Sequence, residues 1–313
     1  MRSVLWGLGL AAIAATAMAA TDVDWAFPGR GAKSDQPADA VTKLSLPGAP
    51  GRFTAAETQD TFRAVDWRPA SHSPMPPVVA FGRQPKVWAC GFCHMPAGEG
   101  RPENASLAGL PRSYIVKQVK AFAAQTRTSV GRGWFPSATM TQVAKDATPA
   151  EINAAADYFS HQTFHSRLRV QEAATVAAPR ADAFLFQAGT GAVQPIGVRI
   201  VEGPSSMTRF ETRDTEIDYV AYVPVGSLVR GATLAGGKGG VQACAGCHGA
   251  GLKGGGLGPP LAGRSPSYMF RQLLAFQTGA RNDADATPMK AVVAKLAPAD
   301  MIALAAYVGS LKP

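Results

Sequence analysis

The chain of 313 residues contains four cysteines, and all four belong to two copies of the pentapeptide Cys-x-x-Cys-His. In this spacing two thiols can add across the two vinyl groups of one haem, and the histidine that follows can place an imidazole nitrogen on the iron. The sequence therefore predicts two covalently bound haem c groups. The predicted thioether residues are Cys90, Cys93, Cys244 and Cys247, and the predicted proximal iron ligands are His94 and His248.

Other sites also use a Cys-x-x-Cys pair, namely zinc knuckles, redox dithiols and structural disulfides. The second copy, with its histidine at the same offset, argues against all three. A tetrahedral zinc site needs four ligands in one neighbourhood, whereas the two pairs lie 154 residues apart. A thioredoxin-type dithiol would need a βαβ context, which neither pair has. Haem attachment is the interpretation that both copies favour.

The N-terminus has the pattern of an export signal. Arg2 precedes an apolar stretch from Val4 to Ala15, and Ala17-Met18-Ala19 matches an A-x-A cleavage site. We predict a signal peptide over residues 1–19 and a periplasmic mature protein. A retained N-terminal anchor is the alternative, but the apolar stretch is short for a membrane span. No later stretch reaches about 18 uninterrupted apolar residues, so we expect no integral membrane segment.

The composition is that of a globular protein, with 46% hydrophobic and 17% charged residues, and the length favours two domains. The formal net charge is +9. Because two haems would bring four propionates that cancel about half of this charge, it does not indicate nucleic-acid binding, and we expect no nucleic-acid partner. A moderately basic surface would suit acidic redox partners, although a generally solvated surface explains the same charge.

The chain contains an internal repeat that includes both pentapeptides. A shift of 154 residues superposes the two motifs and the sequence that follows them, and a shift of 149 residues aligns the later part. The same residue types recur in the same order, which indicates duplication. The repeated pairs include Tyr114 and Tyr268, Gln118 and Gln272, Phe122 and Phe276, Arg127 and Arg281, Met140 and Met289, and Tyr158 and Tyr307.

Each repeat is predicted to be helical. Apolar residues within 114–122 follow a helical period, and residues 268–276 repeat the pattern. A second helix over residues 149–160 begins with a threonine and a glutamate in the arrangement of a capping box. Its counterpart runs over residues 298–311, where Ala297 replaces the capping threonine and predicts a weaker helix start.

The sixth iron ligand must come from outside the pentapeptides. Haem iron in electron-transfer cytochromes takes a second axial side chain, and a thioether raises the reduction potential relative to a second imidazole. Met140 and Met289 occupy equivalent positions, so we predict them as the distal ligands and expect each in a loop between the two helices of its repeat. Met95 adjoins a proximal histidine and cannot reach the far face, and Met269 and Met301 are interpreted as core residues.

Three histidines lie outside the motifs. His161 and His165 have the i, i+4 spacing of a metal-binding pair on one helix face. The second repeat has no counterparts, and histidines at helix ends are commonly solvated or stabilise the helix dipole. His72 precedes the first motif and could approach that haem. We favour packing or solvent exposure for all three.

These features together resemble class I cytochrome c: Cys-x-x-Cys-His, a helix with Tyr and Gln, Phe-x-x-x-x-Arg, a methionine, and a terminal helix with Tyr. The duplication resembles the dihaem cytochrome c4 group, which implies two irons with histidine and methionine ligands and haems close together near the domain interface. Residues 258–263 resemble the family strip in which a proline carbonyl, here that of Pro259, accepts the ring N–H of the proximal histidine. Ala105 stands at this position in the first repeat, so the orientation of His94 is less constrained.

The predicted fold is mainly α, with two tandem class I cytochrome c domains and an extended connector that could hold a small β-hairpin. In the connector, residues 173–183 are flexible in composition, whereas residues 196–200 and 219–223 have the pattern of strands that could pair. Such a hairpin would pack on a domain or dock a partner. The predicted segments are the signal peptide (1–19), an N-terminal extension (20–80), domain 1 (81–165), the connector (166–222) and domain 2 (223–313).

The resemblance implies outer-sphere electron transfer between redox proteins, with a periplasmic dehydrogenase as a candidate donor and a terminal oxidase or reductase as a candidate acceptor. We therefore predict an electron carrier and not an enzyme. Two alternatives stay open. One haem could be catalytic, as in dihaem peroxidases or thiosulfate-oxidising enzymes, although neither repeat supplies an obvious distal acid–base pair. The chain could also be the cytochrome subunit of a dehydrogenase or oxidase complex, with the connector as its contact.

Overall fold

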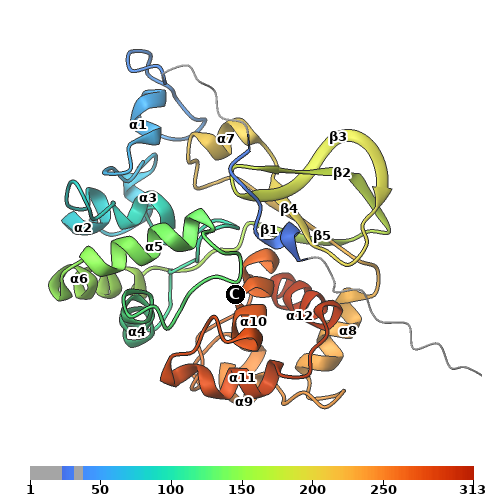
Figure 1. The fold of residues 1–313 in the computed structure, drawn as a ribbon. Helices are drawn as coiled ribbons and strands as arrows, with labels where there is room; N and C mark the ends of the chain where they lie inside the picture. Colours follow the sequence, from blue (N-terminus) through green and yellow to red (C-terminus); the bar gives the residue numbers. More distant parts are fainter. Residues whose placement is uncertain (1–22, 32–37) are drawn as a thin grey trace, which may run out of the picture.

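The computed structural model describes residues 23–31 and 38–313, so the predicted signal peptide lies outside the described residues. Two helical units lie side by side, and a β-rich connector lies above the second unit (Figure 1). Within the described residues, no single helix is long and apolar enough to cross a membrane. One helix pair, residues 284–293 and 298–310, meets the length and composition criteria together but is bent by 111°.

The first helical unit carries the first pentapeptide. α4 and α6 pack against each other around a core that contains Ala156 and Phe159. The predicted capping box is present at α6, because Thr148 Oγ1 accepts the Glu151 N–H at 3.3 Å and the Glu151 carboxylate accepts the Thr148 N–H at 2.7 Å. Both predicted helices of this unit are confirmed. Its helices are α2 (Pro77–Ala80), α3 (Cys90–His94), α4 (Arg112–Ala123), α5 (Phe135–Asp146) and α6 (Pro149–Ser160).

The second helical unit is built around α12, which is buried on almost all sides and packs against α8 and α10. Gly231 of α8 lies so close to α12 that a Cβ atom there would overlap the Ala303 carbonyl oxygen. As predicted, α12 has no side-chain cap at Ala297, although the Asp300 carboxylate accepts the Ala297 N–H at 3.3 Å. The helices are α8 (Ser227–Ala235), α9 (Ala245–His248), η3 (Ala250–Leu252), α10 (Pro266–Thr278), η4 (Ala284–Ala286), α11 (Thr287–Val293) and α12 (Pro298–Ser310).

Two small sheets form most of the connector. In one sheet the central strand β5 is parallel to β1 and antiparallel to β4, and the other sheet is the antiparallel β2–β3 hairpin. A short helix, α7, follows β4 and precedes β5 in the chain, and it lies on the side of the connector that faces α1 (Figure 1). The elements are β1 (Leu168–Glu172), β2 (Thr175–Asp182), β3 (Leu185–Pro195), β4 (Val201–Pro204), α7 (Met207–Glu211) and β5 (Tyr219–Val223).

The structure corrects the expectation for the connector in two places. Residues 173–183 are flexible in composition, yet most of them form β2, because β3 pairs with them and supplies backbone hydrogen bonds. Residues 196–200 form no strand, since Gly197 has a φ of +63° and pairing begins only at Val201. The predicted strand over residues 219–223 is confirmed as β5, and its partners are β1 and β4.

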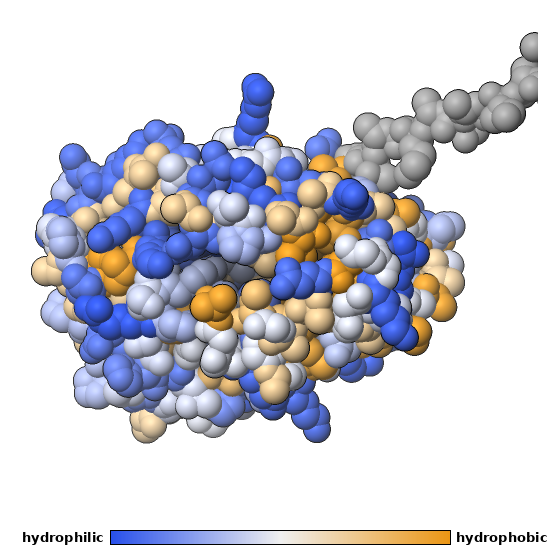
Figure 2. Space-filling model, turned by 90° about the horizontal axis from the view of Figure 1, so that it is seen from below, coloured by the Kyte–Doolittle hydropathy of each residue, from blue (hydrophilic) through white to orange (hydrophobic). Residues whose placement is uncertain are grey.

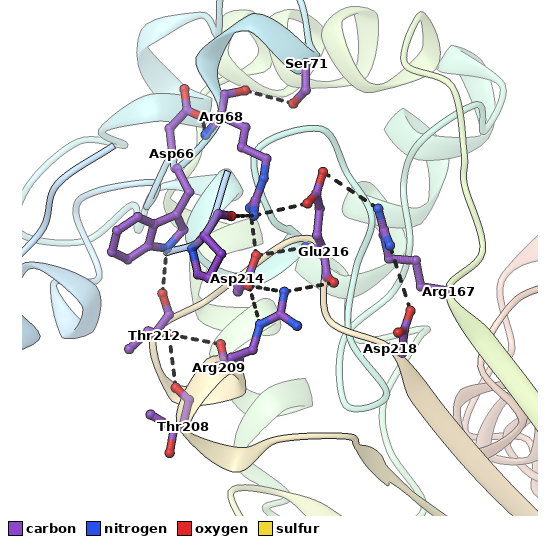
Figure 3. A network of polar contacts seen from close by, with 12 residues as sticks. Asp66, Arg68, Ser71, Arg167, Thr208, Arg209, Thr212, Asp214, Glu216 and Asp218 are labelled. Carbon is purple, nitrogen blue, oxygen red and sulfur yellow. Dashed lines mark hydrogen bonds and ion pairs between the residues drawn. The ribbon is translucent and has the colours of Figure 1, made fainter. Parts of the chain in front are cut away.

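The N-terminal extension packs against the connector through a buried polar network (Figure 3). Arg68 of the extension ion-pairs with Asp214 at 2.7 Å, and Arg209 Nε donates to the other carboxylate oxygen at 2.6 Å. Trp67 Nε1 donates to the Thr212 carbonyl at 2.8 Å. The network thus fixes the segment after α7 against the extension. The helices of the extension are η1 (Asp24–Ala26), α1 (Ala55–Gln59) and η2 (Pro69–Ser71).

Candidate haem sites

A cavity of about 1080 Å³ lies between the two helical units and reaches both pentapeptides. Cavities for drug-sized ligands commonly measure about 300–1,000 Å³, so this one is larger than most single-ligand sites. The face seen in Figure 2 is hollowed near its middle. Cys90 packs against the core of the first unit, and the other predicted site residues line the cavity: Cys93, His94, Met140, Cys244, Cys247, His248 and Met289.

Each proximal histidine is oriented by a backbone carbonyl. His94 Nδ1–H donates to Ala105 O, and His248 Nδ1–H donates to Pro259 O, both at 2.8 Å. Because a carbonyl can only accept, the proton lies on Nδ1 and the Nε2 lone pair is free for iron. Burial lowers the pKa of both imidazoles, which favours the neutral form that binds metals. The hydrogen bond from His94 to Ala105 is as long as that from His248 to Pro259, so alanine in place of proline does not lengthen it.

The residue after each proximal histidine has the same unusual backbone conformation. Its φ is +67° at Met95 and +79° at Gly249. A positive φ ends the short helix at the histidine and turns the chain back, so the carbonyls of His94 and His248 accept N–H bonds at 3.0 and 2.8 Å from glycines six residues later. A non-glycine residue in this region is strained, and the first repeat tolerates it at Met95.

The predicted distal ligands lie in helices and not in loops, which corrects the expectation. Met140 is in the middle of α5, and Met289 is in the first turn of α11. A proline in the first turn of each helix favours the helix start there. Both side chains are half-buried and line the cavity. Met269 and Met301 are buried in the core of the second unit, as predicted.

The histidines outside the motifs do not line the cavity. The His72 side chain is buried, its Nε2 lies 3.2 Å from Asp66 Oδ1, and its Nδ1 lies 3.1 Å from the Tyr158 hydroxyl. His161 and His165 are exposed. Among the described residues, no group of three or more His, Cys, Asp or Glu side chains could hold a metal ion. These positions agree with the packing and solvent interpretations.

A nearly symmetric polar network joins the two units across the cavity. Each arginine in it binds the glutamine of its own repeat at 2.7 or 3.1 Å and the glutamine of the other repeat at 2.9 or 2.7 Å. Each also binds the tyrosine hydroxyl of the other repeat, at 2.9 or 3.4 Å. The members are Tyr114, Gln118 and Arg127, with their repeat equivalents Tyr268, Gln272 and Arg281.

Comparison with known proteins identifies a family for the second helical unit. The family model described as Cytochrome c matches residues 229–312. Cytochrome c4 of Azotobacter vinelandii is 28% identical over 233 residues, which cover 73% of this chain and 87% of that protein. The chain contains a cytochrome c domain and is homologous to cytochrome c4. A thiosulfate dehydrogenase electron acceptor from Thiomonas intermedia strain K12 is 26% identical over 254 residues, which cover 80% of this chain and 88% of that protein.

Solved structures with similar chains include a thiosulfate dehydrogenase, TsdBA, from Marichromatium purpuratum. It gives a TM-score of 0.49 at 26% identity, over 72% of this chain and 37% of that one, so this chain spans little more than a third of its length. Cytochrome c4 of Acidithiobacillus ferrooxidans gives a TM-score of 0.46 at 24% identity, over 71% of this chain and 98% of that one.

Five buried arginines line the cavity. Arg101 forms an ion pair with Glu103 at 3.2 Å, and the other four are Arg127, Arg264, Arg271 and Arg281. In the part of the chain that the structure describes, none of these four forms an ion pair with a carboxylate, and Arg281 Nε has no hydrogen-bond partner. Burial lowers the pKa of Arg264 and Arg271 to about 10, so both stay cationic at neutral pH. Buried cations are costly unless an anionic group lies against them. The propionates of two haems would supply that charge, so the cavity lining fits haem c.

The sequence contained only part of the signal for these arginines. Arg127 and Arg281 align in the repeat, but the alignment does not say that they are buried. Arg264 and Arg271 have no arginine counterparts, since Leu110 and Lys117 stand at the equivalent positions. Only the packing of the two units places all four in one cavity.

Proposed function

We propose that this protein is an exported dihaem c-type cytochrome that carries electrons between periplasmic redox proteins. The observation that supports this most strongly is the shared cavity, which is lined by residues of both Cys-x-x-Cys-His motifs and by both repeat-equivalent methionines. When bound, each haem supplies an iron centre that gains and loses one electron reversibly. One haem on each motif makes the chain a carrier of two electrons.

The residues of the chain hold these groups and set their surroundings. His94 and His248 would bind iron through Nε2, because their Nδ1 protons are donated to backbone carbonyls. Met140 and Met289 would each supply a thioether to an iron from α5 and α11, and two side-chain ligands on each iron would favour electron transfer over substrate binding. The four buried guanidinium groups offset negative charge inside the cavity. Because Leu110 and Lys117 stand where the second repeat has Arg264 and Arg271, the two sites have different electrostatic surroundings, and we propose unequal reduction potentials.

A second candidate function is that of a cytochrome subunit that accepts electrons from a thiosulfate dehydrogenase. The relative from Thiomonas intermedia bears the name of such an acceptor and aligns with 80% of this chain. In this role the protein binds no thiosulfate itself, and electrons arrive from the enzyme. The two candidates share the haem sites and differ in the donor.

Spectroelectrochemical titration of the holoprotein, together with a pyridine haemochrome count, tests the first proposal. We expect two haems for each chain, two one-electron steps at different potentials, and no consumption of thiosulfate or peroxide by the protein alone. Turnover of either substrate by a high-spin haem would contradict the carrier function and favour a dihaem enzyme.

Addition of a purified thiosulfate dehydrogenase with thiosulfate tests the second candidate. Rapid reduction of both haems, absent when thiosulfate is withheld, is the expected result. Reduction no faster than with a mammalian-type monohaem cytochrome c, measured as a matched acceptor, would argue against a dedicated role with this enzyme.

A further inference from the structure

The two haem-attachment motifs differ in how much of their surface is covered. Gly91 and Phe92, between the cysteines of the first motif, are buried, whereas Ala245 and Gly246 at the equivalent positions are exposed. A Cβ atom added to Gly91 would lie 2.8 Å from the side chain of Ala64, and one added to Gly246 would meet nothing within 4 Å. The residues between the two cysteines would lie beside the haem edge that the thioethers hold. The first motif is therefore covered at this place, and the second is open.

The connector supplies much of the cover over the first motif. Arg213 Nη1 donates to the Phe92 carbonyl at 2.7 Å, and its Nε donates to the Thr58 carbonyl of α1 at 2.8 Å. The guanidinium carbon lies 3.4 Å from the centre of the Phe92 ring, which is a cation–π distance. Arg101, after the first motif, makes the same kind of contact with Phe210 of α7 at 3.3 Å. The connector and the extension thus close over this motif together.

The cover is anchored by the polar network of Figure 3. Asp214, directly after Arg213, has a fully buried side chain that binds both Arg68 and Arg209. The carbonyl of Thr212, directly before Arg213, accepts the Trp67 N–H. Because both neighbours are held by other parts of the chain, Arg213 keeps its position over the first motif. These contacts hold the cover in place over the first motif.

The loops around the second motif form an exposed surface, which we call the second-motif face. It consists of Lys238, Ala243, Ala245, Gly246, Lys253 and Leu257. Loops on both sides lie against the motif, since the Gly258 N–H bonds to the Cys247 carbonyl at 2.8 Å and the Cys244 N–H bonds to the Ala235 carbonyl at 3.0 Å. Helix α9, which carries the motif, lies at the lower edge of the molecule in Figure 1.

The second-motif face is basic with a small apolar projection. Residues 236–258 contain Lys238 and Lys253 and no aspartate or glutamate. Leu257 is 96% exposed, the most exposed of the large hydrophobic side chains in the described residues. A basic surface with an exposed apolar side chain is complementary to an acidic surface that contains an apolar spot.

From this asymmetry we propose that electrons enter and leave the protein through the second-motif face, and that the partner docking there is a redox protein with an acidic surface. One electron passes from the reduced centre of the partner to the iron behind the second motif, and no bond forms or breaks. That electron then passes to the iron behind the first motif, which the connector closes to partners. An oxidised partner takes electrons from the same face in turn. The inference rests on the proposed function, because it requires both haems.

Stopped-flow reduction of the holoprotein by the hydroquinone of an acidic flavodoxin tests this inference. Lys238→Glu/Lys253→Glu should slow the second-order reduction of all the haem absorbance by at least about tenfold at low ionic strength, because steering by charge is reversed. The matched control, Lys120→Glu/Lys145→Glu, makes the same change in net charge at exposed residues of the first unit. It should stay within about twofold of the wild type.

Two further measurements are independent in different ways: the first does not alter the two lysines, and the second does not depend on electron transfer. Leu257→Glu, at an exposed side chain outside the motif, should also slow the reduction by flavodoxin, while reduction by ascorbate stays unchanged. Carbodiimide cross-linking joins flavodoxin carboxylates to lysines, and we expect mass spectrometry to place the cross-links on Lys238 and Lys253.

An unchanged rate in Lys238→Glu/Lys253→Glu would overturn the inference, as would a variant in which half of the haem absorbance is still reduced at the wild-type rate. Cross-links concentrated on Lys120 and Lys145 would also overturn it. The haem content of each sample separates this failure from that of the proposed function. A content of fewer than two haems for each chain would contradict both the proposed function and the docking face. Two haems with unchanged rates would contradict only the docking face.

Discussion

Replacement of Asp214 by asparagine should weaken the anchor that closes the connector over the first motif. The carboxylate is 0% exposed and receives three bonds, from Arg68 at 2.7 Å, from Arg209 Nε at 2.6 Å and from the Glu216 N–H at 3.0 Å. Breaking a buried ion pair by neutralising one partner costs about 3–5 kcal/mol. Arg209 is 37% exposed and can be solvated, and Arg68 retains its ion pair with Glu216 at 3.1 Å. We therefore expect the free energy of unfolding to fall by about 3 kcal/mol, at the low end of this range.

Chemical denaturation of the holoprotein, followed by circular dichroism, measures this loss as a change in the free energy of unfolding. The matched control is Asp218→Asn in the same network, because Asp218 is 69% exposed and lies 3.8 Å from Arg167. It should cost less than about 1 kcal/mol. Hydrogen exchange of residues 90–94 should also accelerate in Asp214→Asn. A loss no larger than that of the control, or unchanged exchange at the first motif, would refute the reasoning.

The cost of Asp214→Asn should depend on pH. Burial raises the pKa of Asp214, but the Glu216 N–H and the side chains of Arg209 and Arg68 together lower it below its ordinary value of 3.8. A carboxyl with a lowered folded pKa contributes stability that is fully present above its unfolded pKa and is lost as the pH falls through the folded value. The difference between wild type and variant should be constant near neutral pH and shrink below about pH 4. A difference that grows on acidification would contradict this assignment.

Three further predictions concern the axial ligands and the second unit. Met140→Ala and Met289→Ala should each remove about half of the methionine-to-ferric-iron charge-transfer absorption and create one high-spin haem in EPR, so an unchanged band in either variant excludes that ligand. Gly258→Ala would place a Cβ atom 2.6 Å from the His248 ring, and it should shift the potential of one haem only; two unshifted potentials would show that the ring is not constrained there. Gly231→Val should lower the free energy of unfolding by about 1–3 kcal/mol or more, because α8 can no longer approach α12. Denaturation at wild-type midpoints would contradict that packing.

Features set by local pattern could be predicted from the sequence. The helical period located α4 and α10, and the Thr148 capping box marked the start of α6. The helical placement of Met140 could not be predicted in this way. The start of α5 is fixed by distant contacts, since Trp134 Nε1 donates to the Pro28 carbonyl at 3.0 Å and Phe135 stacks on Phe184 of the connector.

Features that depend on long-range pairing were outside the reach of sequence patterns. β2 is a strand because β3 pairs with it, although its own residues have a flexible composition. The contact between Arg213 and Phe92 joins positions 121 residues apart, and that between Arg68 and Asp214 joins positions 146 residues apart. A count of charges also cannot separate a solvated guanidinium group from a buried one such as that of Arg271. The role of the connector depends on these long-range contacts, which the sequence does not show.

Low-temperature EPR of the oxidised holoprotein, combined with its absorption spectrum, tests the central claim most directly. The claim is that each Cys-x-x-Cys-His motif holds one haem with histidine and methionine on its iron. It predicts two low-spin ferric haems for each chain, together with the charge-transfer band of methionine ligation. A high-spin haem in the unaltered protein, or signals from a single haem, would contradict it.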